Sequence, residues 1–223
     1  MSIEIDERGD VRIMRWNDGE NRVNPDSMAE FHAALDHLEA LDGPLAVVVT
    51  GTGKFFSNGL DLDRFQSAPE ELGETVVMLH SLFARMLLFP AYTVAAINGH
   101  AFAAGAMLTC CFDARVMRSD RGYWCLPEVD LGLPLSAGMV AAVSARIPFE
   151  AAQDAMLTGR RYTAEEALAL GIVTDTCDEA RLLDVAVAFA AEIAGKDRRV
   201  IAEHKRLMFG AAAAVCAPGA PAV

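Results

Sequence analysis

Hydrophobic and polar residues follow two different periods along the first part of the chain. In residues 3–5 and 11–13, apolar side chains alternate with charged ones, which is typical of half-buried strands. From residue 28 to residue 41, apolar side chains recur at helical spacing instead. The sequence NPD at 24–26 supplies an N-cap, a first-turn proline and an early acid. We therefore predict two short strands followed by an amphipathic helix that starts at this NPD.

Short, continuous apolar runs interrupt these periodic segments. Residues 45–50 (LAVVVT), 92–97 (YTVAAI) and 114–117 are too short for typical helices and rich in β-branched residues, so we interpret them as buried strands. Helix-compatible segments at 74–89 and 103–112 separate them. Strand–helix–strand order with short links predicts parallel βαβ units. The expected fold class is therefore α/β with a mostly parallel sheet.

The second half of the chain is dominated by helical spacing. Beyond Ser136 the apolar residues recur in helical register, and the sequence TAEE at 163–166 is typical of a capping box. From Ala211 the chain is rich in alanine, proline and glycine, and we expect this tail to be frayed. We therefore predict a core with its following helices at 1–195 and a C-terminal helix with a frayed tail at 196–223, together one functional domain.

Composition and charge narrow the classes of partner. The 223 residues include 31 Asp and Glu against 19 Lys and Arg, which gives a formal net charge of −12. We do not expect so acidic a chain to bind nucleic acid or an anionic membrane by general electrostatic attraction. The five cysteines include no CxxC pair, which favours a reduced intracellular protein. The sequence has no secretory signal, no spanning apolar stretch and no peroxisomal C-terminal tripeptide, so we predict a cytoplasmic location.

Several common catalytic signatures are absent from the sequence. The five histidines are scattered and form no metal-ligand pattern. There is no GxSxG elbow for a hydroxyl nucleophile and no GxGxxG fingerprint for a dinucleotide. The segment GTGKFF lacks the second half of a P-loop, so we interpret Lys54 as a solvated loop charge. We therefore expect neither a metal site nor a nicotinamide cofactor.

Two strand–turn connections remain as candidates for a site. The first is LAVVVTG followed by KFFSNGLDL, and the second is YTVAAINGH followed by AFAAGAML. Small residues after a strand let backbone N–H groups approach a ligand closely. If residues 103–105 open a helix, its free N–H groups would form an anion site. Tight packing of a helix on a sheet explains the same small residues, and the spacing alone leaves both interpretations open.

Four segments, in this order, resemble motifs of the crotonase, or enoyl-CoA hydratase/isomerase, family. They are FFSNGLDL, INGHAFAAGAML, RGYWCLPEVDLGLPL and TGRRYTAEEALALGIV. The resemblance covers the chain from about Met1 to Leu207. It implies a crotonase-like ββα spiral of mostly parallel sheets with flanking helices. It also implies a helical C-terminal trimerisation region, and hence a homotrimer or hexamer.

The resemblance further implies the residues of an active site for an acyl-CoA thioester. The backbone N–H groups of Leu60 and Ala104 would form an oxyanion hole for the thioester oxygen, although Ala104 departs from the usual glycine. Glu128 matches the family's catalytic glutamate and would act as the base. The loop around Leu60 would contact the CoA portion, mainly through backbone atoms, at Asn58, Gly59, Leu60, Asp61 and Leu62.

The likeness also suggests which reaction to expect. Met107 stands where a typical hydratase has a second glutamate, and a thioether cannot orient water strongly. A single carboxylate suffices for a 1,3-proton shift, so we predict a Δ3,Δ2-enoyl-CoA isomerase that needs no cofactor beyond the CoA of its substrate. One alternative is hydration or thioester cleavage by Glu128 with Asp130. Another is a non-catalytic acyl-CoA-binding protein.

The remaining charged residues near these motifs have plainer interpretations. We expect Asp61 to cap the following turn or helix, and Asp130 to be structural or solvent-facing. Asp113, after an apolar run, is interpreted as a buried hydrogen-bonding residue. Arg22 and Lys205 are candidates for CoA phosphates, but we favour surface charges at both positions.

Overall fold

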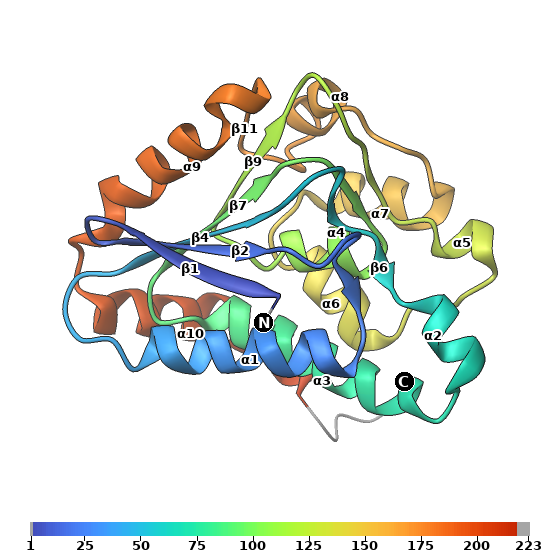
Figure 1. The fold of residues 1–223 in the computed structure, drawn as a ribbon. Helices are drawn as coiled ribbons and strands as arrows, with labels where there is room; N and C mark the ends of the chain where they lie inside the picture. The colour runs from blue at the N-terminus through green and yellow to red at the C-terminus, as the bar shows by residue number, and fades with distance from the viewer. Residues whose placement is uncertain (1, 218–223) are drawn as a thin grey trace.

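The computed structural model describes residues 2–217, and its largest sheet has six strands (Figure 1). The strands are Ile3–Arg8 (β1), Val11–Trp16 (β2), Ala46–Gly51 (β4), Tyr92–Ile97 (β7), Ala114–Arg118 (β9) and Asp175–Cys177 (β11). They lie in this spatial order. β1 pairs antiparallel with β2, and every later strand is parallel to its neighbour. The predicted α/β fold with a mostly parallel sheet is confirmed.

Helices cover both faces of this sheet, which explains why its central strands are apolar throughout. β4 is buried at every position. On one face, α9 (Glu179–Ala194) packs through residues such as Leu182 and Ala186. On the other face lie α1 (Pro25–Glu39), α3 (Glu71–Leu88) and α10 (Arg198–Cys216), seen together below the sheet in Figure 1. A strand between two apolar layers must be hydrophobic on both sides.

Two smaller sheets bring the glycine-containing turns of the sequence together. One has the order β10-β8-β5, formed by Trp124–Cys125 (β10), His100–Phe102 (β8) and Phe55–Ser57 (β5). The other pairs Arg22–Val23 (β3) with Gly59–Leu60 (β6). β5 and β6 belong to the first turn segment, whereas β8 leads from the second turn into α4 (Ala104–Thr109). Segments far apart in the sequence therefore meet where β6 lies against α4.

Local sequence signals explain most of the helix starts. Asn24 accepts the N–H of Ser27, and the Ser27 hydroxyl accepts the N–H of Asn24, so a capping box opens α1. Thr163 and Glu166 form the predicted capping box as well. The other helices are Leu62–Ser67 (α2), Glu128–Leu131 (α5), Ala137–Ser144 (α6), Phe149–Thr158 (α7) and Ala164–Ala169 (α8). Within residues 2–217, no helix combines the length and the apolarity needed to cross a membrane.

The C-terminal helix corrects one prediction. α10 continues to Cys216, whose buried thiol donates to the carbonyl oxygen of Gly138 at 3.2 Å. The fraying expected from Ala211 is therefore wrong for this part of the tail, because alanine favours helix and the segment packs on α3 and α6. Residues 218–223 of the predicted tail lie outside the described residues. The division of the chain at residue 195 stays a prediction.

A buried charge cluster attaches α10 to the core. Lys205 is only 4% exposed; its ammonium donates to the carbonyl oxygen of Ala91 at 2.7 Å and pairs with Asp113 at 2.5 Å. Asp113 also pairs with Arg146 at 2.8 Å and accepts the N–H and hydroxyl of Thr93. Asp113 is thus the expected buried hydrogen-bonding residue. The interpretation of Lys205 as a surface charge, or as a phosphate ligand, is wrong, because a carboxylate distant in sequence holds it inside.

The backbone is strained where β8 enters α4. Ala103 precedes the helix with φ 51° and ψ −126°, a region that residues with a Cβ rarely adopt. Its N–H donates to the carbonyl oxygen of Cys125 at 3.0 Å, so the pairing with β10 holds it there. Gly59 packs against the same point, since a Cβ on Gly59 would lie 2.7 Å from the Ala103 methyl. This strain fixes the position of the first turn of α4.

We predict that Lys205→Ala lowers the free energy of unfolding by about 3 kcal/mol, because removing one member of a buried ion pair leaves its partner without compensation. The value lies at the low end of the usual range because Arg146 still pairs with Asp113. Urea unfolding at pH 7 measures it. Arg206→Ala, which removes an exposed ion pair on the same helix, should cost below about 1 kcal/mol. Equal effects of the two substitutions would contradict the cluster's role.

We predict that Ala103→Gly stabilises the protein by roughly 1 kcal/mol. The substitution relieves backbone strain of about 1–3 kcal/mol but adds about 0.5–1 kcal/mol of chain entropy to the unfolded state. The neighbouring Ala104→Gly, at a helical position, should destabilise the protein by about 0.5–1 kcal/mol. Thermal unfolding of the two variants should therefore shift the midpoint in opposite directions, and a shift of the same sign would refute the strain.

Candidate functional site

A very short helix directs one carboxylate into the protein. α5 follows β10 after Leu126 and Pro127, and it ends after one turn because Gly132 adopts the left-handed conformation at φ 66°. Within this turn, Glu128 is buried whereas Val129 and Leu131 are exposed. The proline before the turn and the glycine after it thus define a single helical turn with its acid on the inner side.

The Glu128 carboxyl group has an unusual environment. The residue is 8% exposed, and its Oε2 atom is buried without a hydrogen-bond partner among residues 2–217. Burial raises the pKa of Glu128 above its ordinary value, because the charged form loses its hydration. A buried polar atom without a partner costs free energy, so such an atom facing a cavity marks a place for a ligand.

Glu128 faces a cavity of about 470 Å³. Four of the residues predicted from the sequence besides Glu128 line it: Asn58, Leu60, Leu62 and Ala104. Met107 lines it too, together with side chains from α3, α5 and α6. The rest of the lining is Arg22, Asp63, Leu72, Val76, Phe102, Ala103, Pro127, Leu131, Leu133, Pro134 and Met139. The cavity is therefore mainly apolar, with its charged residues, Arg22, Asp63 and Glu128, well separated in the sequence.

Leu60 and Ala104 both line this cavity, and Gly59, which precedes Leu60, packs against the backbone of Ala104. A Cβ built on Gly59 would be 3.3 Å from the amide nitrogen of Ala104. Gly59 has φ 80°, and Asp61, on the other side of Leu60, donates its N–H to the carbonyl oxygen of Val23 at 3.0 Å. The N–H of Ala104, the first residue of α4, has no acceptor within its helix. Ala104 thus has a main-chain donor without a partner in its own helix, at a residue that lines the cavity.

Two of the loop residues, Gly59 and Asp61, have structural roles. Gly59 does not line the cavity but permits the close approach of β6 and α4. Asp61 accepts the N–H of Arg64 at 3.3 Å and caps α2, as expected. Asp61 also pairs with Arg22 at 3.2 Å. Gly105 has a structural role as well, because a Cβ there would lie 2.6 Å from the Ser57 Cβ. This glycine therefore allows α4 to pack closely on β5.

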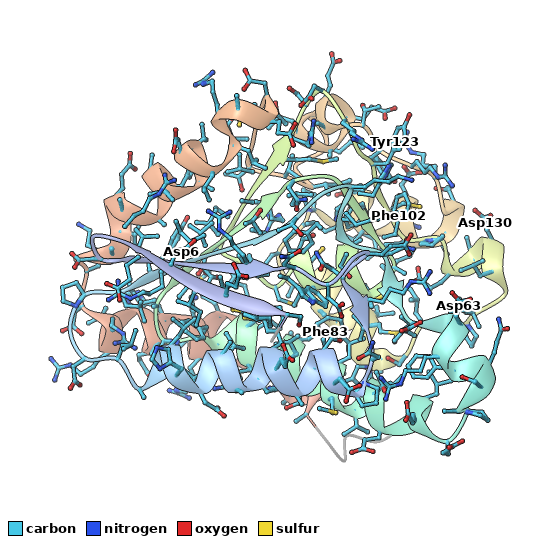
Figure 2. The ribbon with its side chains drawn as sticks, viewed as in Figure 1. Asp6, Asp63, Phe83, Phe102, Tyr123 and Asp130 are labelled. Atoms are coloured by element: carbon cyan, nitrogen blue, oxygen red, sulfur yellow. The ribbon has the colours of Figure 1, made fainter. Side chains whose placement is uncertain are left out.

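The other charged candidates either form ion pairs within the protein or lie outside the cavity. Arg22 pairs with Glu20 at 2.8 Å and with Asp63 at 2.5 Å, in addition to Asp61. Asp130, labelled in Figure 2, is exposed on α5 at the edge of the molecule and does not line the cavity. Its carboxyl group lies instead beside Gly159. Asp130 is thus solvent-facing, as expected. The other carboxylate of the cavity lining, Asp63, is exposed and paired with Arg22.

Sequence reasoning missed much of the cavity wall. Leu72 and Val76 come from α3, Met139 from α6, and Leu133 and Pro134 from the segment after α5. Each is an ordinary apolar residue of a helix or loop, so only the packing of distant elements reveals its place. Within the described part of the chain, no three His, Cys, Asp or Glu side chains gather as ligands for a metal ion.

The sequence matches a known protein family and several of its members. Residues 8–215 match the family described as enoyl-CoA hydratase/isomerase. Enoyl-CoA delta isomerase 3 of Arabidopsis thaliana is 34% identical over 204 residues, which cover 86% of this chain and 84% of the relative. A putative enoyl-CoA hydratase of Thermus thermophilus is 40% identical over 198 residues, covering 84% of this chain and 76% of that protein.

The fold is also that of solved members. The crystal structure of a probable enoyl-CoA hydratase from Mycobacterium tuberculosis superposes with a TM-score of 0.90, covers 97% of this chain and 92% of its own, and is 25% identical. The predicted crotonase-like architecture is therefore confirmed. By its sequence match and its architecture, the chain belongs to the enoyl-CoA hydratase/isomerase, or crotonase, family.

Proposed function

We propose that this protein is a Δ3,Δ2-enoyl-CoA isomerase. In this reaction the Glu128 carboxylate removes a proton from C2 of a 3-enoyl-CoA and returns it to C4, which gives the conjugated trans-2-enoyl-CoA. The observation that carries the proposal is that Glu128 lines an apolar cavity while its Oε2 is buried without a hydrogen-bond partner among residues 2–217. A carboxylate in such surroundings is a stronger base than one in water.

The two amides supply the second requirement of the reaction. Negative charge develops on the thioester oxygen as the C2 proton leaves, and the N–H groups of Leu60 and Ala104 would stabilise it. Preorganised donors of this kind are each worth about 2.7–4 kcal/mol of barrier. Because the amides belong to the main chain of β6 and α4, their position is set by the packing at Gly59 and by the strained Ala103. The shift is redox-neutral, so it requires no cofactor besides the CoA of the substrate.

Met107 favours isomerisation over hydration. It lies on the cavity wall with Glu128, and its thioether neither donates a hydrogen bond nor accepts one strongly. Hydration needs a water molecule held and activated beside the double bond. Besides Glu128, the lining has one other carboxylate, Asp63, and it is paired with Arg22. Relatives named enoyl-CoA delta isomerase support the proposal. From the family resemblance we also propose a homotrimer or hexamer that acts in the cytoplasm.

Hydration is the second candidate, because a relative named putative enoyl-CoA hydratase is 40% identical to this chain. The two reactions differ in substrate and product. An isomerase converts 3-hexenoyl-CoA to a conjugated product, whereas a hydratase adds water to trans-2-hexenoyl-CoA.

Glu128→Gln should lower the rate of 3-hexenoyl-CoA isomerisation by about 10²–10⁴-fold, because the amide keeps the shape of the side chain but cannot accept the proton. Conjugated product is followed by its absorbance, and hexanoyl-CoA binding is measured by calorimetry. Asp130→Asn, on the same helical turn but exposed, is the matched control and should retain the wild-type rate. Full activity of Glu128→Gln would refute the proposed base, and turnover of trans-2-hexenoyl-CoA alone would favour hydration.

The charge of Glu128 should also affect stability in a pH-dependent way. Its folded-state pKa is raised, so below the ordinary value of the unfolded chain both states are protonated and burial costs nothing extra. As pH rises from about 4.5 through the raised pKa, the folded state loses stability relative to a neutral side chain. Glu128→Gln should therefore match the wild type near pH 4 and exceed its stability at pH 8. Thermal unfolding across this range tests it; a constant difference would contradict the raised pKa.

A further inference from the structure

A second cavity lies on the other side of α5. Its volume is about 580 Å³, and it is formed by α5, α6, α7 and the segment between α5 and α6. The helices α5 and α7 lie toward the right in Figure 1. Its lining consists of Glu128, Val129, Gly132, Leu133, Pro134, Leu135, Val140, Ser144, Phe149, Gln153, Met156 and Leu157. Among these lining residues, Glu128 is the single ionisable side chain. The cavity is thus suited to an uncharged, apolar occupant.

The second cavity adjoins the first at the reactive carboxylate. Glu128, Leu133 and Pro134 line both cavities. The amide wall of Leu60 and Ala104 belongs to the first cavity alone. A molecule that extends from the amides past Glu128 therefore reaches the boundary formed by Leu133 and Pro134, where the second cavity begins.

Apolar side chains are left in contact with water around the second cavity. Phe149 and Leu157, both on α7, are 68% and 67% exposed, and Val129 on α5 is 49% exposed. These three exposed side chains line the same cavity, and exposed apolar side chains that gather in this way mark an interaction site. Gln153, which lies between Phe149 and Leu157 on the same helix, also lines the cavity. Covering these side chains with hydrocarbon would remove apolar surface from water.

We propose that the second cavity holds the acyl chain beyond C4, so that the preferred substrates are medium- or long-chain 3-enoyl-CoA thioesters. This inference rests on the proposed function. The thioester oxygen lies at the amides of Leu60 and Ala104, carbons C2 to C4 lie beside Glu128, and the following methylenes pass Leu133 and Pro134. The thioester oxygen, the reacting carbons and the hydrocarbon tail then follow one another along the substrate. Along the two cavities, the main-chain amides, the carboxylate and the apolar lining follow in the same order.

The acyl chain is favoured over a second copy of the protein because the second cavity shares the wall formed by Glu128 with the first cavity. A partner surface would need only the exposed rim, but the lining extends inward to Glu128, Leu133 and Pro134, which also face the first cavity. The opening at Phe149 and Leu157 leaves room for the end of a longer chain. Subunit contact is instead an outcome that the experiment detects.

The test compares 3-dodecenoyl-CoA with 3-hexenoyl-CoA in the full-length protein. The wild type should show kcat/KM at least about tenfold higher for the longer substrate, since buried methylenes add binding energy. Gln153→Trp, which places a large side chain in the second cavity, should lower the ratio of long-chain to short-chain kcat/KM by about tenfold. Glu150→Trp introduces the same side chain at an exposed position of the same helix outside the lining and should leave the ratio unchanged.

The inference is overturned if the wild-type ratio is near one, or if Gln153→Trp lowers both rates equally. It is also overturned if Gln153→Trp changes the oligomeric mass measured by light scattering while the ratio stays constant, because the cavity then belongs to a subunit contact. If neither substrate turns over, the proposed function fails, and calorimetry still decides the inference. Dodecanoyl-CoA should bind at least about tenfold more tightly than hexanoyl-CoA, and Gln153→Trp should remove that difference; equal affinities would overturn it.

Discussion

The Glu128 carboxyl group is held in mainly apolar surroundings, and its Oε2 has no hydrogen-bond partner in the part of the chain that the structure describes. Burying an ionisable group without a donor is unfavourable, so the local structure must leave it no alternative. The single turn of α5, stopped by left-handed Gly132, points Val129 and Leu131 outward and Glu128 inward. Burying this group lowers the stability of the fold, and it also raises the pKa of the carboxyl group. Shifted pKa values of this kind are common at functional sites.

The part of the cavity wall formed by Leu60 and Ala104 depends on backbone geometry. Gly59 has a positive φ and no room for a Cβ, because Ala103 and the amide of Ala104 lie against it. Ala103 itself stays in a conformation that disfavours a side chain, held by its hydrogen bond to Cys125. Such local strain persists only where the surrounding structure imposes it. Three separate segments of the chain thus fix the relative position of two amides, and no side-chain identity is needed for that purpose.

Much of this could be predicted from the sequence, and the failures have a common cause. The run at 45–50 and the NPD at 24–26 are local signals, and both gave the correct element. The motif around Glu128 indicated the carboxylate, although its surroundings were unknown. Lys205 was misjudged because its burial depends on Asp113, which is far away in sequence. The wall residues Val76 and Met139 were missed for the same reason: apolar side chains on helices give no local sign that they face a cavity rather than the core.

The charge balance limits how this protein can bind a CoA thioester. The chain carries a formal net charge of −12, and Arg22, the cation on the wall of the first cavity, is already paired with Glu20, Asp61 and Asp63. Paired cations attract phosphates weakly, and the overall field opposes an anionic ligand. On the proposed function, a large part of the affinity must therefore come from apolar contact. The acyl chain would supply that contact in the second cavity, where Glu128 is the lone ionisable lining residue. Binding through the acyl chain would also affect catalysis. A well-buried tail would hold C2 and C4 of the substrate firmly beside Glu128.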